Sequence, residues 1–148
     1  MGLGRDPSRT PFQWDATPHA GFTRGNPWLP VAMSFQSCNV EAMRTDSASI
    51  LTLYRRLLSV RRDHAALSSG AFRLIGVQGN ALVYERADER ERIVVCLNFG
   101  DSEQQVGVDE VNGASILAST YPVRTTLNSH LVLGPNEGLM MLLKIQSA

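Results

Sequence analysis

The chain has 148 residues, of which 43% are hydrophobic, so it has enough apolar material for one domain with a buried core. Lysine and arginine together number 14, as do aspartate and glutamate, and the zero net charge argues against nucleic acid or an anionic membrane surface as a partner. No apolar run approaches the roughly 18 residues of a membrane-spanning helix, and residues 1–3 do not open a signal peptide. We therefore expect a cytoplasmic protein.

Residues 1–48 are expected to form a long loop, because prolines and glycines interrupt every stretch that could become a long helix or a central strand. Near its start lies GRDPSRTPFQWD, residues 4–15, which combines guanidinium forks, an amide and an indole. Such groups bind sugar hydroxyls and the apolar face of a sugar ring. A solvated proline-rich loop explains the same composition. The candidate binding residues are Arg5, Asp6, Arg9, Gln13 and Trp14.

A helix is predicted within residues 49–67, with its end between Asp63 and Leu67, because short polar residues from Asp46 to Ser49 precede a run with helical periodicity. Its apolar positions form one wide face: Ile50, Leu51, Leu53, Tyr54, Leu57, Leu58 and Val60. Arginines occupy the other side: Arg55, Arg56, Arg61 and Arg62. No aromatic residue interleaves them, so we interpret them as a solvated face rather than a phosphate or nucleic-acid site.

Residues 68–148 read as an antiparallel β-sandwich, because short apolar strands alternate with turn signals. Seven strands are predicted, at residues 71–77, 81–86, 92–99, 104–108, 115–119, 130–133 and 139–145. The third contains a continuous apolar run, Val94 to Leu97, typical of a central strand buried on both faces. The sandwich has four aromatic residues to consider: Phe72, Tyr84, Phe99 and Tyr121. We expect three of these four to lie in the core, which leaves no aromatic platform for carbohydrate on the sandwich itself.

No self-contained catalytic set is evident. The histidines His19, His64 and His130 and the cysteines Cys38 and Cys96 lack metal-ligand spacing. Cys96 lies within an apolar strand and is interpreted as a small buried hydrophobic residue. The acidic residues lie in the loop or at a predicted hairpin tip, where no rigid pair is defined. We predict no catalytic residue, metal or cofactor.

The 4–15 segment resembles the GRDxxRTPMQWD signature of the α-glucosidase and oligo-1,6-glucosidase group in the α-amylase superfamily, glycoside hydrolase family 13. Phe12 stands where that signature has methionine. The sequence after residue 15 keeps the order and spacing of motifs found in that group, with PHAGFT at 18–23, PWLPV at 27–31 and NVEA at 39–42. So do YRRL at 54–57 and RRDHAAL at 61–67.

The resemblance implies a C-terminal part of such an enzyme, whose (β/α)8 barrel alone needs about 250 residues. Residues 1–48 would then be a loop of the barrel's active-site rim, 49–67 the last barrel helix, and 68–148 the C-terminal sandwich. In the family the catalytic carboxylates lie upstream of the GRD motif, so none falls on this chain. One of Arg5 and Arg9 is expected to reach the sugar, Asp6 to orient an arginine, and Gln13 and Trp14 to line the rim, although a structural role for Trp14 stays open.

Two functions follow as hypotheses. The chain is either part of an α-glucosidase-like glycoside hydrolase, inactive alone and contacting an α-glucoside only with a complete barrel, or a stand-alone β-sandwich assembly or binding module. Under either, we expect a homodimer through helix 49–67 and the N-terminal loop, because an exposed apolar helix face needs a partner.

Overall fold

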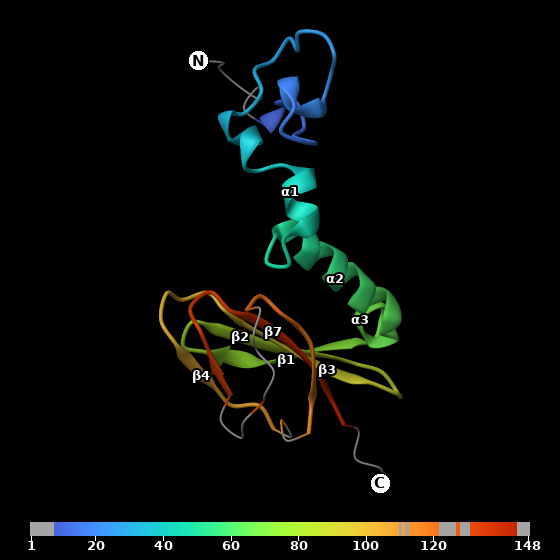
Figure 1. The fold of residues 1–148 in the computed structure, drawn as a ribbon. Helices are drawn as coiled ribbons and strands as arrows, with labels where there is room; N and C mark the ends of the chain where they lie inside the picture. The colour runs from blue at the N-terminus through green and yellow to red at the C-terminus, as the bar shows by residue number, and fades with distance from the viewer. Residues whose placement is uncertain (1–7, 110, 112, 122–126, 128–130, 145–148) are drawn as a thin grey trace. The chain divides into compact units, whose positions relative to one another are not determined.

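The computed structural model describes residues 8–109, 111, 113–121, 127 and 131–144 (Figure 1). The chain divides into two compact units, Met1–Tyr54 and Arg55–Ala148, and the division falls inside helix α2 (Ile50–Asp63). We call them the N-terminal unit and the sandwich unit.

Short helical turns make up the N-terminal unit. They are η2 (Pro18–Gly21), η3 (Met33–Gln36) and α1 (Val40–Thr45). The expectation that residues 8–48 contain no long helix or central strand is confirmed. Asn39 caps α1, since its Oδ1 accepts the Ala42 N–H at 2.9 Å while its Nδ2 donates to the Phe35 carbonyl at 2.8 Å.

Helix α2 begins where the polar residues predict it. The Ser49 hydroxyl accepts the Thr52 N–H at 3.2 Å and donates to the Met43 carbonyl at 2.7 Å. Helix α2 ends at Asp63, within the predicted range of 63–67. His64 is extended (φ −121°, ψ 106°) and separates α2 from the short α3 (Ala65–Ser69), a break that was not predicted. In the described part of the chain, no helix is long and apolar enough to cross a bilayer.

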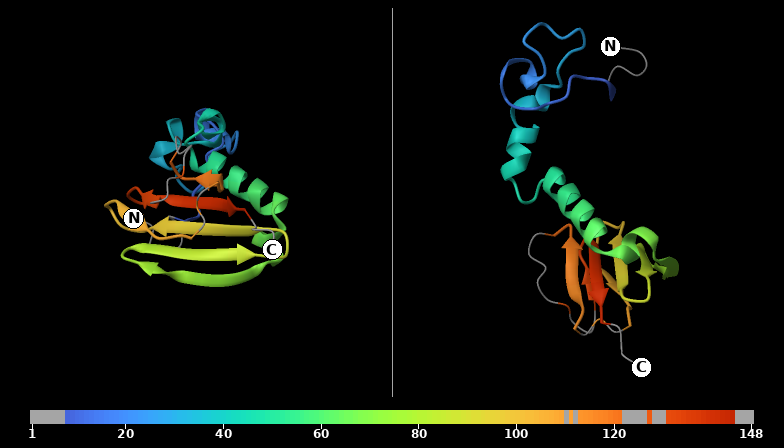
Figure 2. Two further views of the ribbon diagram at one scale, coloured as in Figure 1. Left: turned by 90° about the horizontal axis from the view of Figure 1, so that it is seen from below. Right: turned by 90° about the vertical axis from the view of Figure 1, so that its right-hand side faces the viewer.

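All seven predicted strands are present in the sandwich unit. Five form one antiparallel sheet in the order β1-β2-β3-β7-β5, seen side by side in the left view of Figure 2, and two form a second sheet, β4-β6. Their bounds are β1 (Ala71–Gln78), β2 (Ala81–Ala87), β3 (Arg92–Asn98), β4 (Gln104–Val106), β5 (Ser115–Ser119), β6 (Leu131–Leu133) and β7 (Gly138–Leu143). The predicted outer limits His130 and Ile145 lie outside the described residues.

One apolar core joins the two sheets. Alternate residues of β2, β3 and β7 face it, and β4 and β6 close it from the other side. Its most deeply buried members include Val83, Val94, Cys96, Leu131, Leu133 and Met141. Strand β3 lies centrally, between β2 and β7, and Val94 to Cys96 are buried, which confirms both the predicted central strand and the buried Cys96.

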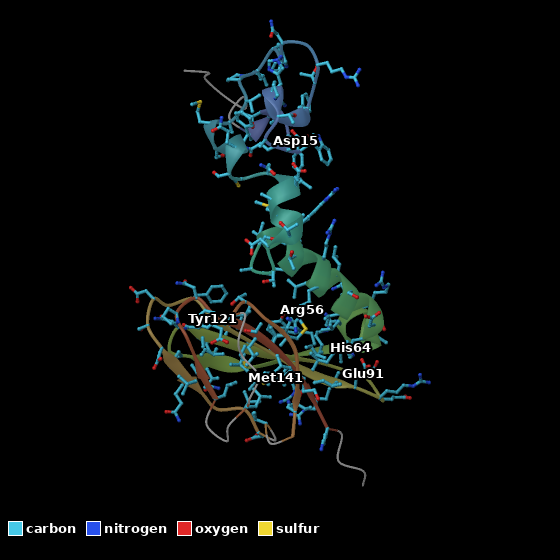
Figure 3. All side chains as sticks on the ribbon, viewed as in Figure 1. Asp15, Arg56, His64, Glu91, Tyr121 and Met141 are labelled. Atoms are coloured by element: carbon cyan, nitrogen blue, oxygen red, sulfur yellow. The ribbon has the colours of Figure 1, made fainter. Side chains whose placement is uncertain are left out.

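The opposite side of the five-stranded sheet, here called the outer face, is partly covered by α3 and by Val60 of α2. Ala66 and Leu67 of α3 pack with Ile93, and Val60 of α2 joins this second cluster. Arg56 (labelled in Figure 3) is exposed and donates from Nε to the Leu117 carbonyl at 3.1 Å.

The prediction that three of the four aromatic residues of the sandwich lie in its core is wrong. Phe72 is 62% exposed and Phe99 is 70% exposed, and Tyr121 is exposed as well. Phe72 pairs with Arg86 in the strand register, which puts its side chain on the outer face rather than toward the core. It contacts Tyr84 with ring centroids 5.4 Å apart.

Candidate functional site

Of the five predicted binding residues, the structure describes three. Arg9, Gln13 and Trp14 lie in the N-terminal unit, whereas Arg5 and Asp6 lie outside the described residues. Arg9 is exposed. The described residues that can form a site in this region are those around Gln13 and Trp14 and those of the loop that follows.

The Gln13–Trp14 backbone is fixed from two sides. The first N–H groups of α1 donate to it, Val40 to the Gln13 carbonyl and Glu41 to the Trp14 carbonyl, both at 3.0 Å. The Trp14 N–H in turn donates to the Ala20 carbonyl at 2.9 Å. Three backbone hydrogen bonds thus position this segment without a strand partner on either side.

The side chains of the segment have different surroundings. Gln13 donates from Nε2 to the Ser34 hydroxyl at 3.2 Å, so part of its hydrogen-bonding capacity is used within the protein. Trp14 is 49% exposed and makes an edge-to-face contact with Phe12, with ring centroids 4.8 Å apart. Together Phe12 and Trp14 form an exposed aromatic surface. Phe12 was not predicted as a site residue, because nothing in its sequence position shows that it contacts Trp14.

A hollow of about 690 Å³ lies beside this segment, within the N-terminal unit. Its lining is mainly apolar and comes from three places: the extended chain at 10–13, α1 and the start of α2. The apolar lining residues are Pro11, Phe12, Val40, Met43, Ile50, Leu51 and Tyr54. Its character fits an apolar partner surface better than a sugar.

A second hollow, of about 730 Å³, is polar and is formed by the loop at 15–24. It is lined by Asp15, Thr17, Pro18, His19, Gly21, Phe22, Thr23 and Arg24. Thr17 donates both its N–H (2.8 Å) and its hydroxyl to Oδ1 of Asp15, and these hydrogen bonds hold the pKa of that carboxyl below its ordinary value. Asp15 is labelled in Figure 3. Residues 15–24 were not predicted as a binding site from the sequence, because only Gly21 signals an unusual backbone conformation in this loop.

Among the described residues, no group of three or more histidine, cysteine, aspartate or glutamate side chains could hold a metal ion. The side chain of Cys38 is exposed and that of Cys96 is buried.

Comparison with known proteins identifies the family. A family model described as the catalytic domain of alpha amylase matches residues 1–70. The chain is 35% identical over 147 residues to a probable oligo-1,6-glucosidase 2 of Bacillus subtilis, covering 97% of this chain and 26% of that protein. It is 38% identical over 100 residues to a trehalose-6-phosphate hydrolase of the same species, covering 67% of this chain and 18% of that protein.

Solved structures agree. An isomaltulose synthase from a Klebsiella species matches with a TM-score of 0.83 and 30% identity, over 95% of this chain and 26% of that one. A trehalose-6-phosphate hydrolase from Bacillus licheniformis matches with a TM-score of 0.82 and 28% identity, over 96% of this chain and 27% of that one. The chain therefore belongs to the α-amylase family, glycoside hydrolase family 13, and corresponds to a C-terminal part of its oligo-1,6-glucosidase-like members. It spans about a quarter of the length of these matched structures.

Proposed function

We propose that this chain supplies part of the substrate rim and the C-terminal sandwich of an enzyme that cleaves or transfers α-glucosyl groups with retention, and that it has no turnover by itself. The observation that carries this proposal is the continuous match to a protein named as an oligo-1,6-glucosidase, over 97% of this chain but 26% of that protein. Glycoside cleavage needs two carboxylates held at a defined separation on a rigid scaffold. In the family these carboxylates lie upstream of the GRD motif, so we assign them to residues beyond these 148.

The parts of the chain have separate roles in this proposal. Residues 1–48 are the loop of the barrel's active-site rim, 49–67 the last barrel helix, and 68–148 the C-terminal domain. The exposed side chains of Trp28, Met33, Ile50 and Tyr54 support this assignment, because a rim loop and a barrel helix bury such side chains against the rest of a barrel.

The rim residues bind the sugar as follows. One of Arg5 and Arg9 donates to ring hydroxyls, and Asp6 orients a guanidinium. Trp14 provides an apolar face for the sugar ring, and its indole is held by the contact with the Phe12 ring. Gln13 helps to fix the segment through its hydrogen bond to Ser34, and the other hydrogen-bonding positions of its amide bind the ligand.

A chimera tests this proposal directly. The 147 matched residues of the Bacillus subtilis relative are replaced by this chain, and hydrolysis of isomaltose and maltose is measured beside the isolated chain. We expect no turnover by the isolated chain and measurable turnover by the chimera. In the chimera, one of Arg5→Ala and Arg9→Ala should lower kcat/KM about tenfold to a hundredfold, since desolvated, charge-assisted contacts are worth a few kcal/mol. Trp14→Ala should lower it about tenfold, through loss of the apolar face for the sugar ring.

Phe99→Ala is the matched control for these variants, because Phe99 is an exposed aromatic residue of the other unit. Turnover by the clean isolated chain contradicts the proposal, and so does a folded chimera without activity on any α-glucoside.

A second candidate function is an assembly module that pairs as a homodimer through residues 49–67 and the N-terminal loop. The apolar hollow beside Phe12 favours it, as do the exposed side chains of Ile50, Tyr54 and Leu58 on α2. Light scattering of the isolated chain, with and without maltose, measures this. We expect a sugar-independent dimer that Tyr54→Glu converts to a monomer. A monomer at all accessible concentrations contradicts the homodimer.

A further inference from the structure

We propose that the polar hollow of residues 15–24 is a preformed binding site for a neutral pyranose ring, separate from the Arg9–Trp14 rim contacts. This inference rests on the proposed function, because it assigns the loop a second sugar contact next to the rim segment. It names a surface that contains none of the five residues predicted from the sequence.

The backbone of this loop is unusual. His19 (φ 57°, ψ 27°), Ala20 (φ 57°, ψ 30°) and Gly21 (φ 64°) are three consecutive residues in the left-handed region. Non-glycine residues adopt this conformation rarely, and when they do, the surrounding structure has to enforce it. Such strained positions concentrate at ligand sites.

Ala20 is the residue through which the conformation is enforced. Its side chain is fully buried, and its carbonyl accepts the N–H groups of both Trp14 (2.9 Å) and Asp15 (3.3 Å). Its own N–H donates to the Thr17 carbonyl at 2.9 Å, and the next turn is closed by the Phe22 N–H on the His19 carbonyl at 3.1 Å. The loop is therefore tied to the rim segment and has a defined shape without a ligand.

The groups around the hollow match a hydroxylated ring. Thr17 occupies Oδ1 of Asp15, which leaves Oδ2 to accept a ligand hydroxyl. Arg24 and His19 add hydrogen-bonding groups, and Phe22, which is 51% exposed, adds an aromatic face for the apolar side of the ring. The volume of about 730 Å³ lies within the range of small-molecule sites.

Charge favours a neutral sugar over a sugar phosphate. Asp15 and Arg24 line the hollow with one charge of each sign, so a phosphate would gain no net attraction there and would also face the Asp15 carboxylate. The loop also needs glycine at position 21 to keep this conformation, because a Cβ there would lie 2.4 Å from Oδ2 of Asp15.

Residue-resolved NMR of the full 148-residue chain tests the inference, with methyl α-glucoside, maltose and glucose 6-phosphate as probes. We expect saturable shifts of the backbone amides of residues 15–24 with the two neutral sugars. Phe22→Ala and Asp15→Asn should each weaken binding about fivefold to tenfold, through loss of the ring contact and of the charged acceptor. Phe99→Ala is the matched control and should change nothing. Unchanged signals of the Asn39-capped α1 show in each variant that the unit is still folded.

The outcomes separate this inference from the proposed function. Shifts confined to Arg9, Gln13 and Trp14 overturn the second site and leave the rim proposal standing. No shift anywhere also overturns the second site, while the chimera assay decides the rim proposal independently. Tighter binding of glucose 6-phosphate than of the neutral sugars contradicts the assignment to a neutral ring.

Discussion

The sandwich unit buries a core of large apolar side chains, although others such as Phe72 and Phe99 are exposed, whereas no large apolar side chain described in the N-terminal unit is buried. Ile93, Leu131, Leu133 and Met141 lie in the first group, with at most 1% of their surface accessible. Trp28 and Met33, each 93% exposed, lie in the second. Among the described residues of the N-terminal unit, the buried apolar side chains are those of Pro11 and Ala20. The sandwich is therefore stabilised by its core, and the N-terminal unit by turn and cap hydrogen bonds.

This difference suggests that one unit provides most of the stability and the other most of the side chains available for binding. Core burial stabilises by an amount that grows with apolar area, and it makes a unit independent of partners. A unit held mainly by hydrogen bonds gains little net stability from each of them, and its exposed side chains are free to contact a ligand or a partner. The predictions below test whether stability and binding separate in this way.

The largest effect is expected from truncation of a core side chain. Met141→Ala removes a fully buried side chain between the sheets and should lower the free energy of unfolding by about 2–5 kcal/mol. Met33→Ala, the matched change at a 93% exposed methionine, should stay within about 0.5 kcal/mol. Chemical denaturation followed by circular dichroism measures both. Equal effects of the two substitutions would contradict the contrast between the units.

A buried polar junction should come next. Asn98 is 4% exposed, donates from Nδ2 to the carbonyls of Ser102 and Gly134 (both 2.8 Å) and accepts the Gly100 N–H at 2.9 Å. Asn98→Ala leaves these backbone groups without their partner and should cost about 2–3 kcal/mol in a denaturant titration. Asn26→Ala, at an exposed loop position, serves as its control. A loss below about 0.5 kcal/mol at Asn98 would show that water replaces the amide without cost.

Within the N-terminal unit, Gly21→Ala should disturb the loop alone. The substitution places a Cβ at φ +64° and against the Asp15 carboxylate, a local cost of about 1–2 kcal/mol. Amide hydrogen exchange of Trp14 should accelerate while protection of β3 stays constant. Gly25→Ala, whose added Cβ would meet no atom closer than 4.0 Å, should change neither. Slower exchange in β3 or faster exchange in both units would mean that the loop and the sandwich are coupled.

The smallest effect concerns pH and Glu85. Burial acts to raise the pKa of this carboxyl, but hydrogen bonds from Arg73 (3.1 Å) and Arg92 outweigh it and hold the pKa below its ordinary value. A lowered pKa in the folded state means that the stabilisation is complete above the ordinary glutamate pKa and is lost as pH falls through the lowered value.

Glu85→Gln should therefore cost about 1 kcal/mol at neutral pH, because Arg73 is exposed and the pair is partly screened. The difference from the unsubstituted chain should vanish at acid pH, where Glu85 is protonated in both states. Unfolding titrations across the acid range measure this. A constant difference at all pH values would exclude the ionised carboxylate as its source.

Much of the sandwich was predictable because its signals are local. The bounds of β5 agree to the residue with the sequence prediction, and Ser49 caps α2 as expected. Both depend on neighbours within a few positions. The face that Phe72 occupies was mispredicted and the separate helix α3 was not predicted, because strand register and the packing of α3 on the sheet are set by residues distant in sequence.

The candidate site was less predictable for the same reason. The GRD motif and its residue types are readable in the sequence, and Gln13 and Trp14 do lie together on one fixed segment. The contact of Phe12 with Trp14 and the polar hollow around Asp15 were not readable, because each depends on how the loop folds back. The roles of Arg5, Arg9 and Asp6, and the homodimer, stay predictions.

The amino-acid sequence by itself determined the family, the mainly antiparallel β fold and the position of each strand, because motif spacing, caps and alternation are encoded over short stretches. Only the tertiary structure decided which face each aromatic side chain occupies and how residues 18–21 close onto Trp14. It did so because the register of paired strands, and a left-handed turn at His19 and Ala20, are enforced by contacts that the local sequence does not specify.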